Sequence, residues 1–80
     1  MRRMDKEYAE RVQKRFGARM RHFRTAIRPK VSQEALANIA GLDRSYTGKV
    51  ERGKKNVSLV NINRIADALQ VEVAELFREG

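Results

Sequence analysis

Apolar residues recur every three or four positions along the first third of the chain. Between Asp5 and Ile27 the repeat consists of Tyr8, Val12, Phe16, Met20, Phe23 and Ile27. This spacing gathers the apolar side chains into one stripe along an α-helix. Asp5 is a suitable N-cap, and Pro29 requires the helix to end by Arg28, because the residue before a proline disfavours helical backbone angles. The pattern therefore predicts one long amphipathic helix from Asp5 to about Ile27.

The same spacing returns in two shorter runs near the C-terminus. Ser58 can cap a helix whose buried face consists of Leu59, Ile62, Ile65, Ala66 and Leu69. The run from Val71 to Phe77 predicts a last short helix, with an inner side made of Val73, Leu76 and Phe77. Both segments are predicted to be mainly scaffold.

The central stretch, residues 32–53, has the spacing of two short helices joined by a tight turn. Ser32 can cap the first helix, and Gly41 ends it at a position where a left-handed backbone favours glycine. Asp43 can cap a second helix that runs from Arg44 to about Glu51. This arrangement is a helix-turn-helix.

The second of these helices has two distinct faces. At 100° per residue, one face consists of Arg44, Ser45, Gly48 and Lys49, and the other consists of Tyr46, Thr47 and Val50. The first face is small, polar and cationic, and the second can pack inward. A helix of this kind suits insertion into the major groove of DNA.

At these residues the chain resembles the Cro and phage-repressor-like family, also called the xenobiotic-response-element family. The matching run, from Ser32 to Ala68, reads SQEALANIAGLDRSYTGKVERGKKNVSLVNINRIADA. The family pattern is approximately S-Q-E-x-L-A-x-x-x-G-L-x-x-x-Y-I-S-x-x-E-R-G-x-x-x-P-S-L. The resemblance implies an all-α, compact five-helix lambda-repressor-like domain, here with an extended first helix. Residues 1–80 are then one DNA-binding domain, with a basic helical extension over residues 1–15.

The chain departs from the family pattern at four positions. Thr47 and Gly48 replace the usual isoleucine and serine, Val57 replaces a proline, and Gln70 stands where the family has a glycine after the helix. We expect the Thr47 hydroxyl to donate to the Asp43 carbonyl. Gly48 has two open readings: either the backbone approaches the DNA closely there, or specificity depends on the neighbouring residues. Gln70 predicts a strained or less abrupt exit from its helix.

Positive charge is concentrated at the N-terminal end. Of the net charge of +8, residues 1–30 contribute eleven Lys or Arg and three acids, whereas residues 31–80 hold seven of each. The first helix is therefore predicted to supply most of the field that attracts a polyanion. The chain has no cysteine, which excludes disulfides and thiolate metal sites and fits a reducing compartment. Because the apolar runs are short, we expect a cytoplasmic protein without a signal peptide or a membrane span.

The predicted N-terminal extension carries six basic residues, namely Arg2, Arg3, Lys6, Arg11, Lys14 and Arg15. Three readings stay open for it: a solvated helix that maintains solubility, an arm that contacts DNA phosphates, and a helix that binds a partner protein or a membrane surface. Tyr8 and Val12 lie beyond the usual domain. We expect them to cover the last helix or a second subunit.

Individual DNA contacts follow from residue chemistry and from the family resemblance. We expect Arg44 and Lys49 to read guanines through O6 and N7, with Ser45 assisting. The residues expected to contact phosphate are Gln33, Tyr46, Arg52, Lys54, Lys55 and Asn56. Phosphates repel a carboxylate, so Glu51 is expected to form a salt bridge with Arg19 or Arg24 instead. For each cationic candidate, the alternative is a solvated charge on the surface. For Tyr46 the alternative is plain packing, and for Gln33 it is support of the second helix or a residue without a specific role.

These observations favour a sequence-specific transcription regulator, either a repressor or an operon controller. One short helix contacts few base pairs, so we expect a homodimer on a palindromic site in double-stranded DNA, joined through the C-terminal helix and in one alternative also through the N-terminal helix. The alternative function is a protein-interaction or antitoxin-like adaptor that uses the basic N-terminal helix. An enzyme is not expected, because the sequence offers no acid–base pair and His22 has no partner for catalysis or for a metal. We expect neither a cofactor nor a metal.

Overall fold

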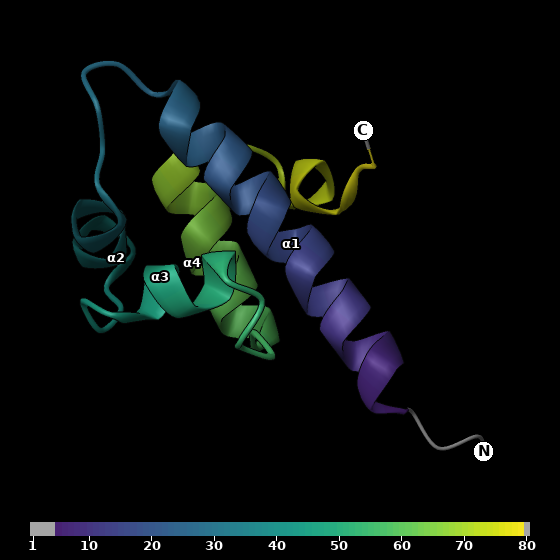
Figure 1. Cartoon of the computed structure of the whole chain (residues 1–80). Helices are drawn as coiled ribbons and strands as arrows, with labels where there is room; N and C mark the ends of the chain where they lie inside the picture. The colour runs from purple at the N-terminus through teal and green to yellow at the C-terminus, as the bar shows by residue number, and fades with distance from the viewer. Residues whose placement is uncertain (1–4, 80) are drawn as a thin grey trace.

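Residues 5–79 fold into four α-helices followed by a 3₁₀ helix (Figure 1). The computed structural model describes residues 5–79, and its elements are α1 (Lys6–Ala26), α2 (Gln33–Ala40), α3 (Tyr46–Glu51), α4 (Leu59–Leu69) and η1 (Val73–Phe77). In Figure 1, α2 and α3 lie on one side of α1, and η1 lies on the other. The predicted all-α fold is confirmed. Arg2 and Arg3 lie outside the described residues.

Side chains at the helix starts explain where the helices begin. The Asp5 carboxylate accepts from the Tyr8 N–H at 2.7 Å, the Ser32 hydroxyl accepts from the Ala35 N–H at 3.0 Å, and the Ser58 hydroxyl accepts from the Asn61 N–H at 3.1 Å. Each of these bonds satisfies one backbone donor that the first helical turn leaves free. The predicted N-caps Asp5, Ser32 and Ser58 are confirmed.

Left-handed residues end α2 and α4. Gly41 follows α2 with φ of 74°, as predicted. Gln70 follows α4 with φ of 59° and is the non-glycine residue with positive φ in the described chain. A side chain with a Cβ disfavours this conformation by about 1 kcal/mol or more. The exit from α4 is therefore strained, as the missing glycine predicted.

The hydrophobic core lies where all five elements meet. Its fully buried large side chains are Met20, Leu36, Val50, Ile65 and Leu76, and Phe16, Ala66 and Leu69 complete it. These residues come from the apolar stripes predicted for each segment. The stripes are therefore confirmed as core faces, except at Leu59. The apolar repeat predicted Leu59 to be buried, but at the first position of α4 it is 75% exposed.

The last element is shorter and tighter than the predicted helix over residues 71–77. It is a 3₁₀ helix that begins at Val73, so Val71 and Glu72 precede it. Leu76 is fully buried, whereas Phe77 keeps 44% of its surface exposed and lies against the Phe16 ring with centroids 5.3 Å apart. Five residues complete too few α-helical hydrogen bonds to favour the α form over the 3₁₀ form.

Close contact between α1 and α3 depends on a glycine. A Cβ at Gly17 would overlap the Val50 carbonyl oxygen and would lie 3.0 Å from the Glu51 carbonyl oxygen. The absence of a side chain lets the backbones of α1 and α3 approach each other directly. Gly17 therefore sets the position of α3 relative to the long helix, a role that the apolar repeat did not indicate.

The N-terminal turns of α1 project past the rest of the molecule (Figure 1). The described residues measure 44 × 26 × 19 Å, and the 21 residues of α1 account for about 31 Å of length. Val12 borders a small hollow together with Phe77, Ile62 and Val57, so it covers the last helix as expected. Tyr8 is half exposed. Within residues 5–79, no helix is both long and apolar enough to cross a membrane.

Candidate nucleic-acid interface

The turn between α2 and α3 is closed by Asp43. Its carboxylate accepts from the Ser45 hydroxyl at 2.7 Å and from the Ser45 N–H at 3.2 Å, and these bonds, led by the hydroxyl, lower the pKa of Asp43. The Asp43 carbonyl also accepts from the Tyr46 N–H at 2.9 Å. The prediction that Asp43 caps the second helix is therefore wrong: its side chain closes the turn, and the N-cap residue of α3 is Ser45, which makes no side-chain capping bond.

The predicted start of α3 at Arg44 is wrong by two residues. Regular α-helix begins at Tyr46, and Arg44 and Ser45 form the turn before it. The physical reason is that the side chain of Asp43 binds the Ser45 N–H, which produces a turn rather than a helical first residue. Arg44 and Ser45 therefore project from the N-terminal end of α3, and Lys49 lies further along the helix.

The predicted partner of Thr47 is also wrong. Its hydroxyl donates to the Gln33 carbonyl of α2 and not to the Asp43 carbonyl. Thr47 is fully buried, and at this depth its hydroxyl requires a partner. The bond ties α3 to the first residue of α2 and fixes the angle between the two helices.

Gly48 is buried, although the helical wheel assigned it to the outer face. A Cβ at Gly48 would lie 3.0 Å from the Gln33 side-chain oxygen and 3.2 Å from an Arg52 guanidinium nitrogen. Neighbouring side chains therefore occupy the space next to the glycine. This geometry favours the reading in which specificity depends on the residues around Gly48.

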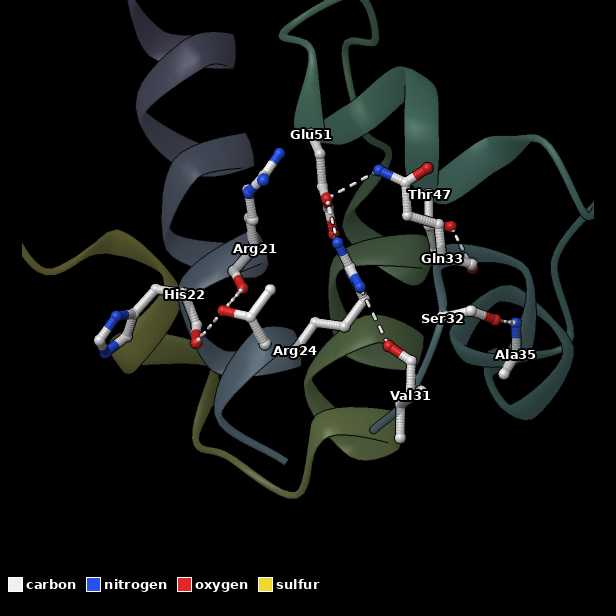
Figure 2. Close-up of polar contacts among 10 residues, drawn as sticks. Arg21, His22, Arg24, Val31, Ser32, Gln33, Ala35, Thr47 and Glu51 are labelled. Carbon is white, nitrogen blue, oxygen red and sulfur yellow. Dashed lines mark hydrogen bonds and ion pairs between the residues drawn. The ribbon is translucent and has the colours of Figure 1, made fainter. Parts of the chain in front are cut away.

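A buried ion pair connects α1 to the last residue of α3 (Figure 2). Arg24 donates to both carboxylate oxygens of Glu51, from Nε at 2.6 Å and from Nη2 at 2.9 Å, and Gln33 Nε2 donates to the same carboxylate at 2.9 Å. The Arg24 and Glu51 side chains are 12% and 2% exposed. The hydrogen bond to Glu51 raises the pKa of Arg24.

This network decides between the two partners expected for Glu51. Arg24 is the partner, and Nη1 of Arg24 also donates to the Val31 carbonyl at 3.0 Å. Arg19 instead reaches Glu75 in η1, with an N–O distance of 3.7 Å. Since Arg24, Gln33 and Glu51 belong to three different helices, the network joins α1, α2 and α3 into a rigid unit.

The predicted base-contacting side chains all lie on the surface. Arg44, Ser45 and Lys49 are exposed, and Nη2 of Arg44 donates to Glu34 Oε2 at 2.9 Å. That hydrogen bond raises the pKa of Arg44. The side chains of Arg44, Ser45 and Lys49 are therefore accessible to a ligand. The structure also places Glu34 against Arg44, a contact that the sequence analysis did not predict.

The basic loop after α3 lies against α1. At Gly53, with φ of 74°, a Cβ would lie only 3.1 Å from Lys14 Cα, so the loop and the long helix touch through a glycine. Lys14 therefore lies beside the loop that carries the predicted phosphate contacts. The exposed residues of this loop are Arg52, Lys54 and Asn56.

Tyr46 links the loop to α4. Its hydroxyl accepts from Asn61 Nδ2 at 3.2 Å, and Lys55 Nζ lies 5.4 Å from the centroid of its ring. Both Tyr46 and Lys55 are half-buried. A cation over an aromatic face is attracted to it, so Tyr46 holds Lys55 beside α3.

The chain is similar to known proteins over most of its length. A family model described as a helix-turn-helix domain matches residues 15–78. The control protein C.MunI from Mycoplasma sp is 40% identical over 81% of this chain and 86% of its own length. The chain belongs to this helix-turn-helix family.

Two further comparisons agree. The control protein C.BamHI from Bacillus amyloliquefaciens is 43% identical over 76% of this chain and 74% of its own length. The crystal structure of the restriction-modification controller protein C.AhdI from Aeromonas hydrophila has a TM-score of 0.78 and 54% identity, covering 85% of this chain and 96% of that chain. As a member of the helix-turn-helix family, the chain is a DNA-binding transcription regulator.

The helix-turn-helix family model covers only part of α1. It begins at residue 15, whereas α1 begins at Lys6. The turns that carry Tyr8 and Val12 therefore precede the matched domain. His22, within the matched part, is exposed and stacks edge-on against Phe23 with ring centroids 5.2 Å apart, and the described residues contain no cluster of three or more acidic or histidine side chains fit for a metal.

Proposed function

We propose that this regulator controls a restriction–modification operon by binding a two-fold symmetric operator as a homodimer. The proposal takes its biological setting from the control proteins to which the chain is similar. A single six-residue recognition helix spans too few base pairs to single out one genomic site. Two reading units about 34 Å apart would double the number of specified base pairs.

The observation that carries the proposal is the contrast between the two sides of α3. Its inner side is held by the buried bond from Thr47 to Gln33 and by the Arg24–Glu51 pair. The turn before α3 and the outer side of the helix present Arg44 and Lys49 to solvent. A rigid support that presents solvent-exposed cationic side chains is what direct readout of guanine edges requires.

The roles that we propose for individual residues follow from these positions. Arg44 and Lys49 contact guanine O6 and N7, and Ser45 assists from the turn. Phosphate contacts come from Gln33, Tyr46, Arg52, Lys54, Lys55 and Asn56. The Gln33 amide nitrogen and the Tyr46 ring already have partners within the protein, so these two residues also orient their neighbours.

We propose that the dimer forms through the C-terminal part of the chain, with the N-terminal turns of α1 taking part. Phe77 in η1 is 44% exposed, and Tyr8 in α1 is 50% exposed. Val12 and Phe77 border the same hollow of about 130 Å³ between the two elements. A second copy that covers this apolar region would remove it from water, which is the main favourable contribution to protein association.

Selection of bound duplexes from a random pool tests the proposed function. The expected result is a palindrome with half-sites one helical turn apart, protected in a footprint, and a protein that sediments as a dimer at the concentrations used. Absence of any enriched sequence, or enrichment of a single half-site by a monomer, would overturn the proposal.

A second candidate function is an adaptor that holds an acidic partner through the N-terminal turns of α1. The exposed Tyr8 ring favours it, because Tyr8 and its neighbour Arg11, 5.5 Å from the ring centroid, form an amphipathic surface outside the matched domain. The test is a pull-down in high salt. Retention of a partner there, together with DNA binding that lacks sequence preference, would favour the adaptor.

A further inference from the structure

The guanidinium group of Arg44 donates a hydrogen bond to the carboxylate of Glu34. Nη2 of Arg44 lies 2.9 Å from Oε2 of Glu34, the second residue of α2. Both side chains are open to water, with 77% of Arg44 and 63% of Glu34 exposed. The contact therefore lies on the surface where a DNA duplex would bind the reading helix.

The fold does not need this contact. The α2–α3 pair is already joined by the bond from Thr47 to Gln33 and by the bond from Gln33 to Glu51. An ion pair between exposed side chains adds little to stability, because water and salt screen it. The position of the Glu34–Arg44 pair at the reading end of α3 therefore calls for a different explanation.

An explanation comes from the difference between Arg44 bound to a guanine and Arg44 near a phosphate of an unrelated sequence. Guanine offers O6 and N7 to a guanidinium, and this bidentate contact can replace the hydrogen bond to Glu34. A phosphate on an unrelated sequence attracts Arg44 mainly by charge, and the nearby carboxylate cancels that attraction while repelling the phosphate. Glu34 therefore weakens non-specific binding more than it weakens binding to the correct base.

The neighbouring acid, Asp43, helps to raise the pKa of Arg44 by its charge but makes no hydrogen bond to it. Asp43 is engaged by the hydroxyl and the N–H of Ser45, whereas Glu34 is the carboxylate to which Arg44 donates. Lys49 has no ion-pair partner among residues 5–79 of the structure. Of the two predicted guanine readers, Arg44 alone is thus held by an acid.

We propose that Glu34 is a specificity-determining residue, which holds the Arg44 guanidinium at the start of α3 and releases it for a guanine edge but not for a phosphate. This inference rests on the proposed function, since it requires an operator that the wild-type protein prefers. Glu34 makes its contribution through Arg44, without contacting DNA itself.

The test is Glu34→Gln, which keeps the size of the side chain and removes its charge. Dissociation constants are measured for the selected operator and for a scrambled duplex between about 50 and about 200 mM salt. We expect affinity for the scrambled duplex to rise about tenfold at the lower salt and its salt slope to steepen by about 0.9, because one more cation is free to displace a counterion. Affinity for the operator should rise less, so the ratio of the two falls.

Two further variants separate this role from a general charge effect. Glu72→Gln removes an exposed acid at the start of η1 that makes no side-chain capping bond, and it should leave the specificity ratio unchanged. In an Arg44→Ala background, Glu34→Gln should change affinity for both duplexes by the same factor. Thermal unfolding of Glu34→Gln should match the wild type.

The outcomes distinguish the two proposals. A wild-type protein that shows no preference for any operator would overturn the proposed function. A wild-type protein that prefers its operator, with the same ratio and salt slope in Glu34→Gln, would overturn the role of Glu34 alone. The same drop in ratio for Glu72→Gln would also overturn it, because any lost acid would then be sufficient.

Discussion

Two arginine–glutamate pairs flank the reading helix, and they differ in their access to water. The Arg24–Glu51 side chains are 12% and 2% exposed, whereas the Arg44–Glu34 side chains are 77% and 63% exposed. The buried pair connects helices distant in sequence and has additional bonds to Gln33 and Val31. The exposed pair has one bond and lies in solvent.

The difference in exposure distinguishes a pair that positions α3 from a pair at a proposed base-contacting residue. Removing one member of a buried pair leaves a charge without compensation in a region that water cannot reach. Removing one member of an exposed pair leaves a charge that water solvates. The first pair therefore contributes to the position of α3, whereas the second, in the role proposed for Glu34, holds a side chain that leaves its partner when it binds a guanine.

The largest expected effect comes from breaking the buried pair. Glu51→Ala leaves the Arg24 guanidinium uncompensated, and we expect the free energy of unfolding to fall by about 3–5 kcal/mol. Urea denaturation measures this loss. Glu34→Ala, which breaks the exposed pair, is the matched control and should leave the urea midpoint almost unchanged. Equal losses for the two variants would contradict the comparison.

The next largest effect is expected from a substitution in α1 at its contact with α3. Gly17→Ala introduces a Cβ that overlaps the Val50 carbonyl oxygen, so α3 must move away from α1. We expect a loss of about 1–3 kcal/mol, even though alanine is the better helix former. Ala18→Gly, at the exposed neighbouring position, should cost about 1 kcal/mol through helix propensity alone. A more stable Gly17→Ala variant would show that the approach of the two helices is not tight.

A third prediction concerns the outer side of α3. Lys49→Ala removes an exposed side chain without disturbing the support, so stability should stay the same. Operator binding should weaken by about 1–3 kcal/mol, with relaxed preference at one base pair. Binding to a set of operators with single base changes measures this effect. Uniform weakening across the set would mean that Lys49 contacts phosphate and not a base.

The same contrast explains how much of the fold could be predicted from sequence. Caps such as Asp5, Ser32 and Ser58 act on backbone groups within three residues, so local sequence is sufficient to locate them. The apolar repeats likewise identify the core faces of the helices, because periodicity depends on residues that are close in the chain.

Contacts between helices could not be predicted in the same way. The wheel assigned Gly48 to the outer face, yet the side chain of Gln33 covers it, and the Thr47 hydroxyl reaches α2 rather than its own turn. Both outcomes depend on how α2 and α3 cross, which periodicity within a single helix does not specify. Arg24 and Arg19 were equally suitable partners for Glu51 for the same reason.

The smallest expected effect separates readers from residues that position the protein on DNA. Lys54 is exposed in the loop after α3, and its proposed contact is a phosphate and not a base edge. Lys54→Ala should therefore weaken binding to all sequences by a similar factor, about 1 kcal/mol or less, and should reduce the salt slope by about 0.9. Titrations of operator and scrambled duplex at several salt concentrations measure both quantities. If Lys54→Ala lowered affinity for the operator alone, the loop would take part in readout, and the division between a supported reading helix and a sequence-independent loop would be wrong.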